Sequence, residues 1–296
     1  MSEVTVGIIG GSGLYDIAGI RDLDEVIIDT PFGSPSDAFI TGRLEGVRCV
    51  FMPRHGRGHR LLPHEINYRA NIWGLKKLGV RHVLGVSAVG SLRQEIAPGH
   101  LVVPDQIIDR TRTRISTFFG EGCAGHVQFG DPFENNLRRV VLDAVGDVGA
   151  KVHEGGTYVC IEGPTFSTRA ESELYRAWGC SIVRMTNVPE ARLAREAELA
   201  YATLALSTDY DCWHGAEDEV SVESVLAIIR ENVSTAKAVI RQVCKRLAAI
   251  GHVDWPSHSA LGGGGAVMTS PARIPPETKL RLDLLLGHYL WPQEER

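Results

Sequence analysis

Several apolar, β-branched stretches of this 296-residue chain end in glycines, hydroxyls or basic side chains. The first stretch, Val4 to Ile9, runs into the glycine turn GGSG at residues 10–13. Glycine lets the backbone approach a ligand closely, and successive N–H groups can form a nest for an anion around the Ser12 hydroxyl. The turn could therefore hold a single phosphate, although a tight turn without a ligand can have the same sequence.

A strand that runs into glycines is also typical of dinucleotide-binding folds. The fingerprint GxGxxG, counted from Gly11, requires glycine at residue 16, where Asp16 stands. Counted from Gly10, it meets Ser12 in place of its second glycine. The fingerprint fails in both frames, and a nicotinamide-dinucleotide oxidoreductase is the competing hypothesis from a different class.

Three further segments offer oxyanion donors where strands are expected to end. The segment MPRHGRGHR follows VRCVFM and contains Arg54 and His55; Ser87 and Ala88 follow a second strand, and Thr186 follows a third. Arginine suits bidentate contacts with oxyanions, although such a basic run is often only a solvated loop. Ligands of α/β sheets bind at the carboxyl ends of strands, so we expect these side chains to converge.

Two carboxylates end another predicted strand, in LSTDYDCWH. If the chain stays extended, Asp209 and Asp211 point to the same side, so both can face one ligand. A carboxylate pair can bind a metal, transfer protons or cap a helix. No further oxygen or histidine ligands lie beside the pair in the sequence, which argues against a metal.

Hydrophobic periodicity predicts an α/β fold in which a mixed sheet is flanked by helices. The expected strands cover 4–9, 47–52, 82–87, 181–186 and 201–208; the expected helices start at Asn67 and Asn187 and cover 222–250 and 279–290. We expect small residues 88–91 to form a turn. Asn187 and Glu190 have the spacing of a helix-capping box, and Gly251 ends the longest helix.

Composition excludes several classes of protein. With 31 basic and 36 acidic residues the net charge is -5, so no overall positive field attracts a nucleic acid. The mean hydropathy is -0.04, and no segment is apolar over the length that a membrane span needs. The six cysteines form no CxxC pair, and the N-terminus lacks the charge pattern of a secretory signal. We expect a reduced, metal-free cytoplasmic protein.

Eight motifs, in order, resemble the S-methyl-5'-thioadenosine phosphorylase family of the trimeric purine nucleoside phosphorylase superfamily. They are GIIGGSGLYD, RHGRGH, LPHEINYRANIW, GSLRQEIAPG, VPDQIIDRTRTRISTFF, IEGPTFSTRAES, MTNVPEARLAREAELAYA and STDYDCW. The resemblance covers roughly residues 4–250 and implies the three-layer nucleoside phosphorylase-type fold. It divides the chain into one phosphorylase domain, 1–250, and a C-terminal extension, 251–296, with a glycine-rich joint at 262–265 and a short helix.

The resemblance also assigns roles to particular residues. It implies phosphate contacts from Ser12, Arg54, His55, Ser87, Ala88 and Thr186, and purine contacts from Phe166, Ser167, Asp209 and Asp211. Around the ribose and its 5' group it implies Met185, Val222, Val225, Leu226 and, from a neighbouring subunit, His126. Periodicity alone favours another role for the three aliphatic residues, which is to pack in the core as part of the apolar stripe of the long helix.

The implied reaction is phosphorolysis of an N-glycosidic bond in a homotrimer whose sites lie at subunit interfaces, with phosphate as co-substrate and no metal or organic cofactor. The expected catalytic residues are Asp209 and Asp211. An ionised carboxylate accepts from a 6-amino group but repels a 6-oxo group, so adenine is expected as the base. Phosphorylases of 6-oxopurine nucleosides or methylthioinosine, a 5'-halogenated substrate and a non-catalytic nucleoside sensor remain alternatives.

Overall fold

The fold is built on one mixed β-sheet. The computed structural model describes residues 3–11, 13–14, 16–214 and 222–291, and it leaves out the side chains of 222–227 and 229. The strands are β1 Thr5–Gly10, β2 Arg21–Val26, β3 Phe39–Leu44, β4 Val47–Pro53, β5 His82–Ser91, β6 Leu101–Val103, β7 Gln106–Arg110, β8 Val152–Glu154, β9 Thr157–Ile161, β10 Ile182–Arg184 and β11 Ala200–Tyr210.

Their order, β2-β3-β4-β1-β5-β10-β9-β7, has a branch at β5, where β11 pairs with both β5 and β6 and β8 extends the branch. Strand β1 lies parallel to β4 and β5, and β5 lies parallel to β11, so the carboxyl ends of four strands meet at one edge. The sheet therefore can gather residues that are far apart in the sequence.

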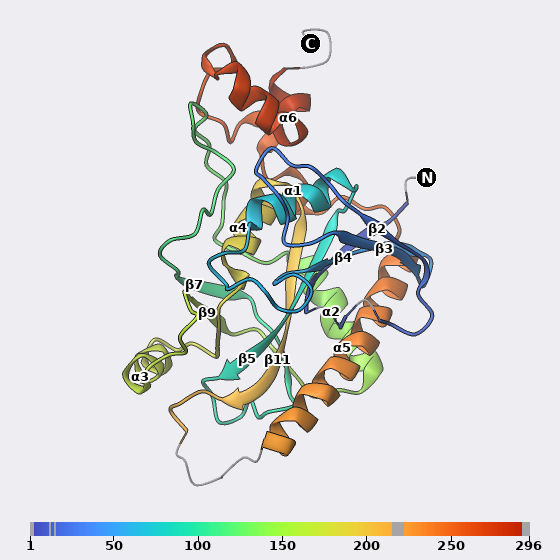
Figure 1. Ribbon diagram of the computed structural model, residues 1–296, viewed down its shortest axis with the longest axis vertical. Coiled ribbons are helices and arrows are strands. Elements are labelled where there is room, and N and C mark those ends of the chain that lie inside the picture. The colour runs from blue at the N-terminus through green and yellow to red at the C-terminus, as the bar shows by residue number, and fades with distance from the viewer. Residues whose placement is uncertain (1–2, 12, 15, 215–221, 292–296) are drawn as a thin grey trace.

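Helices cover both faces of the sheet, as predicted (Figure 1). They are α1 Tyr68–Lys77, α2 Asn135–Val148, α3 Arg169–Ala177, α4 Asn187–Glu196, α5 Val222–Ile250 and α6 Pro276–Leu290, with short 3-10 turns at Pro256–Ser259, Gly262–Gly264 and Pro271–Arg273. Helices α2 and α5 pack in one apolar cluster with β1, β4 and β11, whereas α1 and α4 pack in a second cluster on the other face. The three-layer α/β fold is confirmed.

The longest predicted helix has the bounds that periodicity gave it. Helix α5 spans Val222–Ile250, and Gly251, with φ +75°, ends it by donating its N–H to the Leu247 carbonyl at 3.0 Å. Glycine adopts the left-handed conformation without a steric penalty, and a residue in this conformation ends the helix. Asn67, where a helix was expected to start, caps α1 through its side chain.

The turn expected at residues 88–91 is wrong. These residues continue β5, whose Gly90 and Ser91 pair with Val183 and Ile182 of β10, while β11 pairs with β5 to its last residue. Pairing with two strands holds this segment extended although small residues have a low strand propensity. Small side chains also allow neighbouring chain segments to approach closely. Ser87 and Ala88 therefore lie within a strand.

Residues 251–291 pack against the rest of the chain. The Ser257 amide and hydroxyl donate to Glu134 Oε2 at 3.0 and 2.6 Å, and the Leu261 amide donates to Glu198 at 3.0 Å. Leu282 and Leu285 of α6 are buried in the cluster of α1 and α4. The division of the chain at residue 250 stays a prediction.

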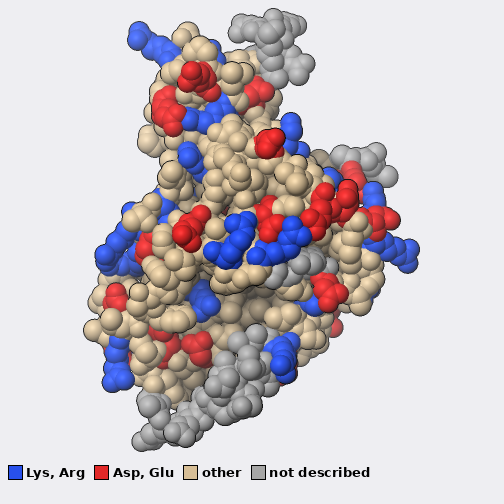
Figure 2. Space-filling view, in the orientation of Figure 1, with Lys and Arg blue, Asp and Glu red and all other residues tan. Residues whose placement is uncertain are grey.

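Charged groups of both signs are interspersed on the face shown in Figure 2. In the part of the chain that the structure describes, no helix has the length and apolarity to cross a bilayer.

Candidate active site

A cavity of about 220 Å³ lies at the ends of β1, β4 and β10, beside the middle of β5. We call it the Arg54 cavity. Its lining residues are Gly11, Gly13, Leu14, Arg54, His55, His59, Val86, Ser87, Ala88, Arg184, Thr186, Leu206 and Val233. Five of the six predicted phosphate-contacting residues thus come together. The sixth, Ser12, lies outside the described residues, but its neighbours Gly11 and Gly13 are part of the lining.

Two hydroxyls of the Arg54 cavity lack a partner. Ser87 Oγ and Thr186 Oγ1 are buried, and neither has a hydrogen-bond partner of normal geometry among the residues that the structure describes, although the buried Tyr158 hydroxyl lies beside Ser87. A buried hydroxyl without a partner costs about 1–3 kcal/mol, so such groups are normally satisfied. A ligand with acceptor oxygens in this cavity would satisfy both.

Arg54 follows β4 into the cavity wall and is held from several directions. Its Nε and Nη2 contact the two carboxylate oxygens of Glu190, the latter at 3.1 Å. Nη1 donates to the Val86 carbonyl at 3.1 Å and Nη2 to the Ile9 carbonyl at 3.3 Å. Burial by itself would lower the pKa of Arg54, but the charge and hydrogen bonds of Glu190 outweigh it and raise the pKa. The guanidinium is fixed and permanently charged.

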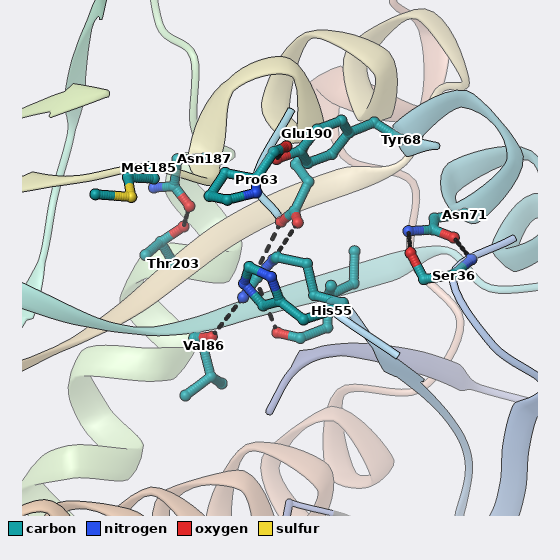
Figure 3. Close-up of polar contacts among 12 residues, drawn as sticks. Ser36, His55, Pro63, Tyr68, Asn71, Val86, Met185, Asn187, Glu190 and Thr203 are labelled. Atoms are coloured by element: carbon teal, nitrogen blue, oxygen red, sulfur yellow. Dashed lines mark hydrogen bonds and ion pairs between the residues drawn. The ribbon is translucent and has the colours of Figure 1, made fainter. Parts of the chain in front are cut away.

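Glu190 is a site residue that the sequence analysis placed wrongly. Thr186, not Asn187, is the N-cap of α4, and it makes no capping bond through its side chain. The Glu190 carboxylate points from α4 toward the sheet (Figure 3), where it also accepts from the Tyr201 hydroxyl at 2.9 Å. Asn187 is buried beside it and accepts from Tyr201 and Thr203. The predicted capping box is instead the anchor of Arg54.

His55 is uncharged at neutral pH. Its burial is the main reason that its pKa is lowered to about 4, and the nearby charge of Arg54 lowers it further. Nδ1 lies 2.8 Å from the Leu61 carbonyl, which can only accept, so Nδ1 carries the proton. The other ring nitrogen, Nε2, is then an acceptor.

A second, smaller cavity adjoins the Arg54 cavity. It measures about 20 Å³ and is lined by Gly90, Ile161, Phe166, Ser167, Val183, Arg184, Met185, Asp209 and Asp211. We call it the Asp209 cavity. Arg184 lines both cavities, and Met185 in one is followed in the chain by Thr186 in the other. The predicted base-binding and phosphate-binding residues therefore lie on two sides of the end of β10.

The two carboxylates lie together over Gly90. Strand β11 has a bulge between Ser207 and Asp209 and continues to Tyr210. A Cβ at Gly90 would be 3.2 Å from Asp209 Oδ1 and 3.3 Å from Asp211 Cβ, so glycine makes room for the pair. Asp209 is exposed, whereas burial, with a smaller contribution from Asp209, raises the pKa of Asp211. Asp211 therefore holds a proton more readily than an isolated carboxylate does.

Met185 and Phe166, with Ile161 and Val183, form the apolar part of the Asp209 cavity. Met185 is buried, and Gly163 fits against it, because a Cβ there would be 2.6 Å from the Met185 sulfur. Phe166 is 65% exposed, and the Arg184 guanidinium lies 5.6 Å from the centre of its ring. An exposed aromatic ring at the mouth of a cavity can stack on a flat ligand.

Of the remaining predicted residues, only His126 has a described side chain, and it is not brought to these cavities in the single chain. His126 is exposed and lines a different hollow, of about 610 Å³, together with Arg195 and Gly262. Val222, Val225 and Leu226 belong to α5, but their side chains lie outside the described part. Leu14, Leu206 and Val233, which line the Arg54 cavity, were not predicted.

No group of three or more His, Cys, Asp or Glu side chains suited to a metal occurs within residues 3–11, 13–14, 16–214 and 222–291. The absence of a cofactor stays a prediction.

Glu196, six residues after Glu190 on α4, is a buried carboxyl whose protonation should affect stability. It accepts from the Phe118 amide at 2.6 Å and the Thr117 hydroxyl at 2.8 Å, and burial raises its pKa to about 7. Because the folded state binds this proton more tightly, the associated stability is complete below pH 4.5 and is lost as the pH rises through 7.

We expect Glu196→Gln, which resembles the protonated carboxyl, to have nearly wild-type stability at pH 5. At pH 8 it should be more stable than wild type by on the order of 2–3 kcal/mol. Urea unfolding at the two pH values measures the difference, and a difference that does not change with pH would contradict the assignment.

Comparison with known proteins extends these observations. A family model described as the phosphorylase superfamily matches residues 5–245. A protein of Geobacter sulfurreducens named S-methyl-5'-thioadenosine phosphorylase is 56% identical over 289 residues, which are 97% of this chain and 100% of that protein. The crystal structure of a methylthioadenosine phosphorylase from an antarctic soil metagenomic library is 46% identical, with a TM-score of 0.92 over 97% of this chain and 100% of that one. Methylthioadenosine phosphorylase from Schistosoma mansoni in complex with adenine is 38% identical, with a TM-score of 0.78 over 90% and 99% of the two chains.

Proposed function

Because this chain belongs to the phosphorylase superfamily, we propose that it cleaves S-methyl-5'-thioadenosine with inorganic phosphate into adenine and 5-methylthioribose 1-phosphate. One observation carries the proposal. Unpartnered hydroxyls and a fixed arginine line one cavity, a carboxylate pair lines the next, and the two cavities share Arg184. An oxyanion site beside a site for a hydrogen-bond donor suits phosphate and an aminopurine.

Phosphate binds in the Arg54 cavity. Ser87 and Thr186 donate through their hydroxyls, which lack other partners, and Arg54 offers the remaining N–H of Nη1. Gly11 and Gly13 line the cavity on the side of β1, and the Ser12 hydroxyl is proposed to donate to the phosphate there. His55, with Nε2 as an acceptor, can take a hydrogen bond from a protonated phosphate oxygen. The backbone of Ala88 completes the wall.

The nucleoside binds between Met185 and the carboxylate pair. Met185 packs under the ribose, while Phe166 and Ser167 line the purine. Asp209 and Asp211 then face the purine edge that carries N7 and the 6-amino group. The amino group donates to a carboxylate, whereas a 6-oxo group in its place would oppose one acceptor to another.

The reaction exchanges one bond at C1' for another. Phosphate attacks C1' from below the sugar while the bond to N9 breaks, and the purine takes the bonding electrons. Asp209 supplies a proton to N7 or pairs with N7 once it is protonated, so the base leaves as neutral adenine. The raised pKa of Asp211 favours a proton at the pair, which helps this step. These residues require no organic cofactor.

We further propose that the 5' methylthio group is bound at an interface between subunits of a homotrimer. In a homotrimer, His126 of one subunit reaches the methylthio end of a neighbouring site, where Val222, Val225 and Leu226 form an apolar wall. The position of His126 away from the Arg54 cavity of its own chain, on an exposed hollow, supports this arrangement. The enzyme acts in the cytoplasm, where free phosphate is present.

A base-release assay tests the proposed function. Methylthioadenosine, adenosine, methylthioinosine and inosine are each incubated with the enzyme, with and without phosphate, and the free base is identified by chromatography. We expect rapid adenine release from methylthioadenosine only with phosphate. Release without phosphate would indicate a hydrolase, and preferred release of hypoxanthine would indicate a 6-oxopurine phosphorylase. Binding of adenosine analogues without any release would indicate a sensor.

A further inference from the structure

Arg54 and His55, the basic residues predicted to bind phosphate, give the site little net positive charge. Glu190 contacts Arg54 through both carboxylate oxygens, and both side chains are almost completely buried, at 3% and 2% exposure. This carboxylate therefore cancels the arginine charge at close range. His55 is uncharged at neutral pH, since its pKa is lowered to about 4. A phosphate dianion in this cavity needs another positive group, because desolvating an anion without a counter-charge is costly.

Arg184 is the other arginine of the cavity lining. It ends β10, two residues before Thr186, and it lines both the Arg54 cavity and the Asp209 cavity. Arg184 and Thr186 both line the Arg54 cavity, so the guanidinium and the Thr186 hydroxyl lie at the same site. The Arg184 charge reaches this site, since it helps to lower the pKa of His55.

Unlike Arg54, Arg184 has no acidic partner among the residues that the structure describes. Its side chain makes no ion pair or hydrogen bond with any residue in the described ranges, and its guanidinium lies over the face of the Phe166 ring. A half-buried guanidinium that rests on an aromatic ring keeps all five N–H donors available. Its charge is therefore free to act on a ligand.

We propose that Arg184 binds the substrate phosphate and supplies the uncompensated positive charge of the phosphate site. This inference rests on the proposed function and adds a residue to it. Arg54 fixes the geometry of the site, whereas Arg184 attracts the dianion and stays beside the sugar phosphate that forms from it. Because Arg184 also lines the Asp209 cavity, it stands between the two substrates.

The test compares Arg184→Gln and Arg184→Lys with the wild-type enzyme. The control is Arg43→Gln, which removes the same charge from an exposed arginine of β3 that pairs with Glu3 and Asp22. Two quantities are measured at pH 8, where histidines in general carry little charge: the KM for each substrate, and the Kd of inorganic phosphate by titration calorimetry without nucleoside.

We expect Arg184→Gln to raise both the phosphate KM and the phosphate Kd about tenfold or more, because a charge-assisted contact is lost. The KM for methylthioadenosine should change by less than about threefold, and Arg184→Lys should recover most of the phosphate affinity because it restores the charge. Arg43→Gln should behave as wild type in both measurements. Thermal unfolding of each variant shows that the fold is retained.

An unchanged phosphate Kd in Arg184→Gln would overturn the inference and leave the proposed function intact. A rise confined to the nucleoside KM would also overturn it, because Arg184 would then act on the base through Phe166. If the wild-type enzyme binds phosphate but releases no base, the proposed function fails, and the Kd of Arg184→Gln still decides the role of Arg184. A wild-type enzyme that binds no phosphate would contradict both.

Discussion

Asp209→Asn is expected to lower kcat/KM for methylthioadenosine by about 10²-fold or more, with a change of less than about 1 kcal/mol in the free energy of unfolding. Asp209 is exposed, and its recorded hydrogen bond is with the neighbouring Thr208 hydroxyl, at 2.7 Å, so the fold depends little on it. Its proposed contact with the purine exists only when substrate is bound and strengthens as the base departs. The measurements are steady-state kinetics and urea unfolding.

The same variant should also change the choice of base. An Asn side chain can donate to a 6-oxo group, so the ratio of activity on methylthioinosine to activity on methylthioadenosine should rise. Asp147→Asn is the matched control, since Asp147 is a remote surface carboxylate that pairs with Arg246. If Asp209→Asn loses stability and activity in equal measure, its role is structural and the assignment is wrong.

Arg54→Met is expected to abolish measurable phosphorolysis and to lower the free energy of unfolding by about 3–5 kcal/mol. The substitution leaves the buried Glu190 carboxylate without its main partner, and it removes donors from the carbonyls of Ile9 and Val86. An unpaired buried charge is the larger of the two costs. Urea unfolding measures the loss directly.

The double variant Arg54→Met/Glu190→Gln separates stability from function. Neutralising residue 190 removes the unpaired charge, so a large part of the lost stability should return, while phosphorolysis stays absent. Tyr201 can still hydrogen-bond with the new amide. A double variant less stable than Arg54→Met alone would contradict the claim that the unpaired charge of Glu190 is the main cost of the single substitution.

The sequence predicted the parts of the fold whose cause is local. Helix α5 could be placed to the residue because its apolar stripe runs unbroken to Gly251, and β1 and β4 have the β-branched composition of buried parallel strands. The segment 88–91 could not be predicted locally, because two partner strands, not its own composition, keep it extended.

The candidate site divides in the same way. Converging strand ends indicated Arg54, Ser87 and Thr186, which do line one cavity. Glu190 was missed because its partner lies 136 residues away in the sequence, while its neighbours fit an ordinary helix start. A buried arginine requires a buried acid, so Glu190 could have been sought once Arg54 was placed in the core. His126 lines a different hollow, and a single chain cannot test a role that depends on a second one.

The most direct test of the account follows the phosphorus atom. With methylthioadenosine and inorganic phosphate as the substrates, 31P NMR of the reaction should show inorganic phosphate converted into a sugar 1-phosphate, in an amount equal to the adenine released. Release of adenine with the inorganic phosphate signal unchanged would contradict the claim that the Arg54 cavity delivers phosphate to C1'.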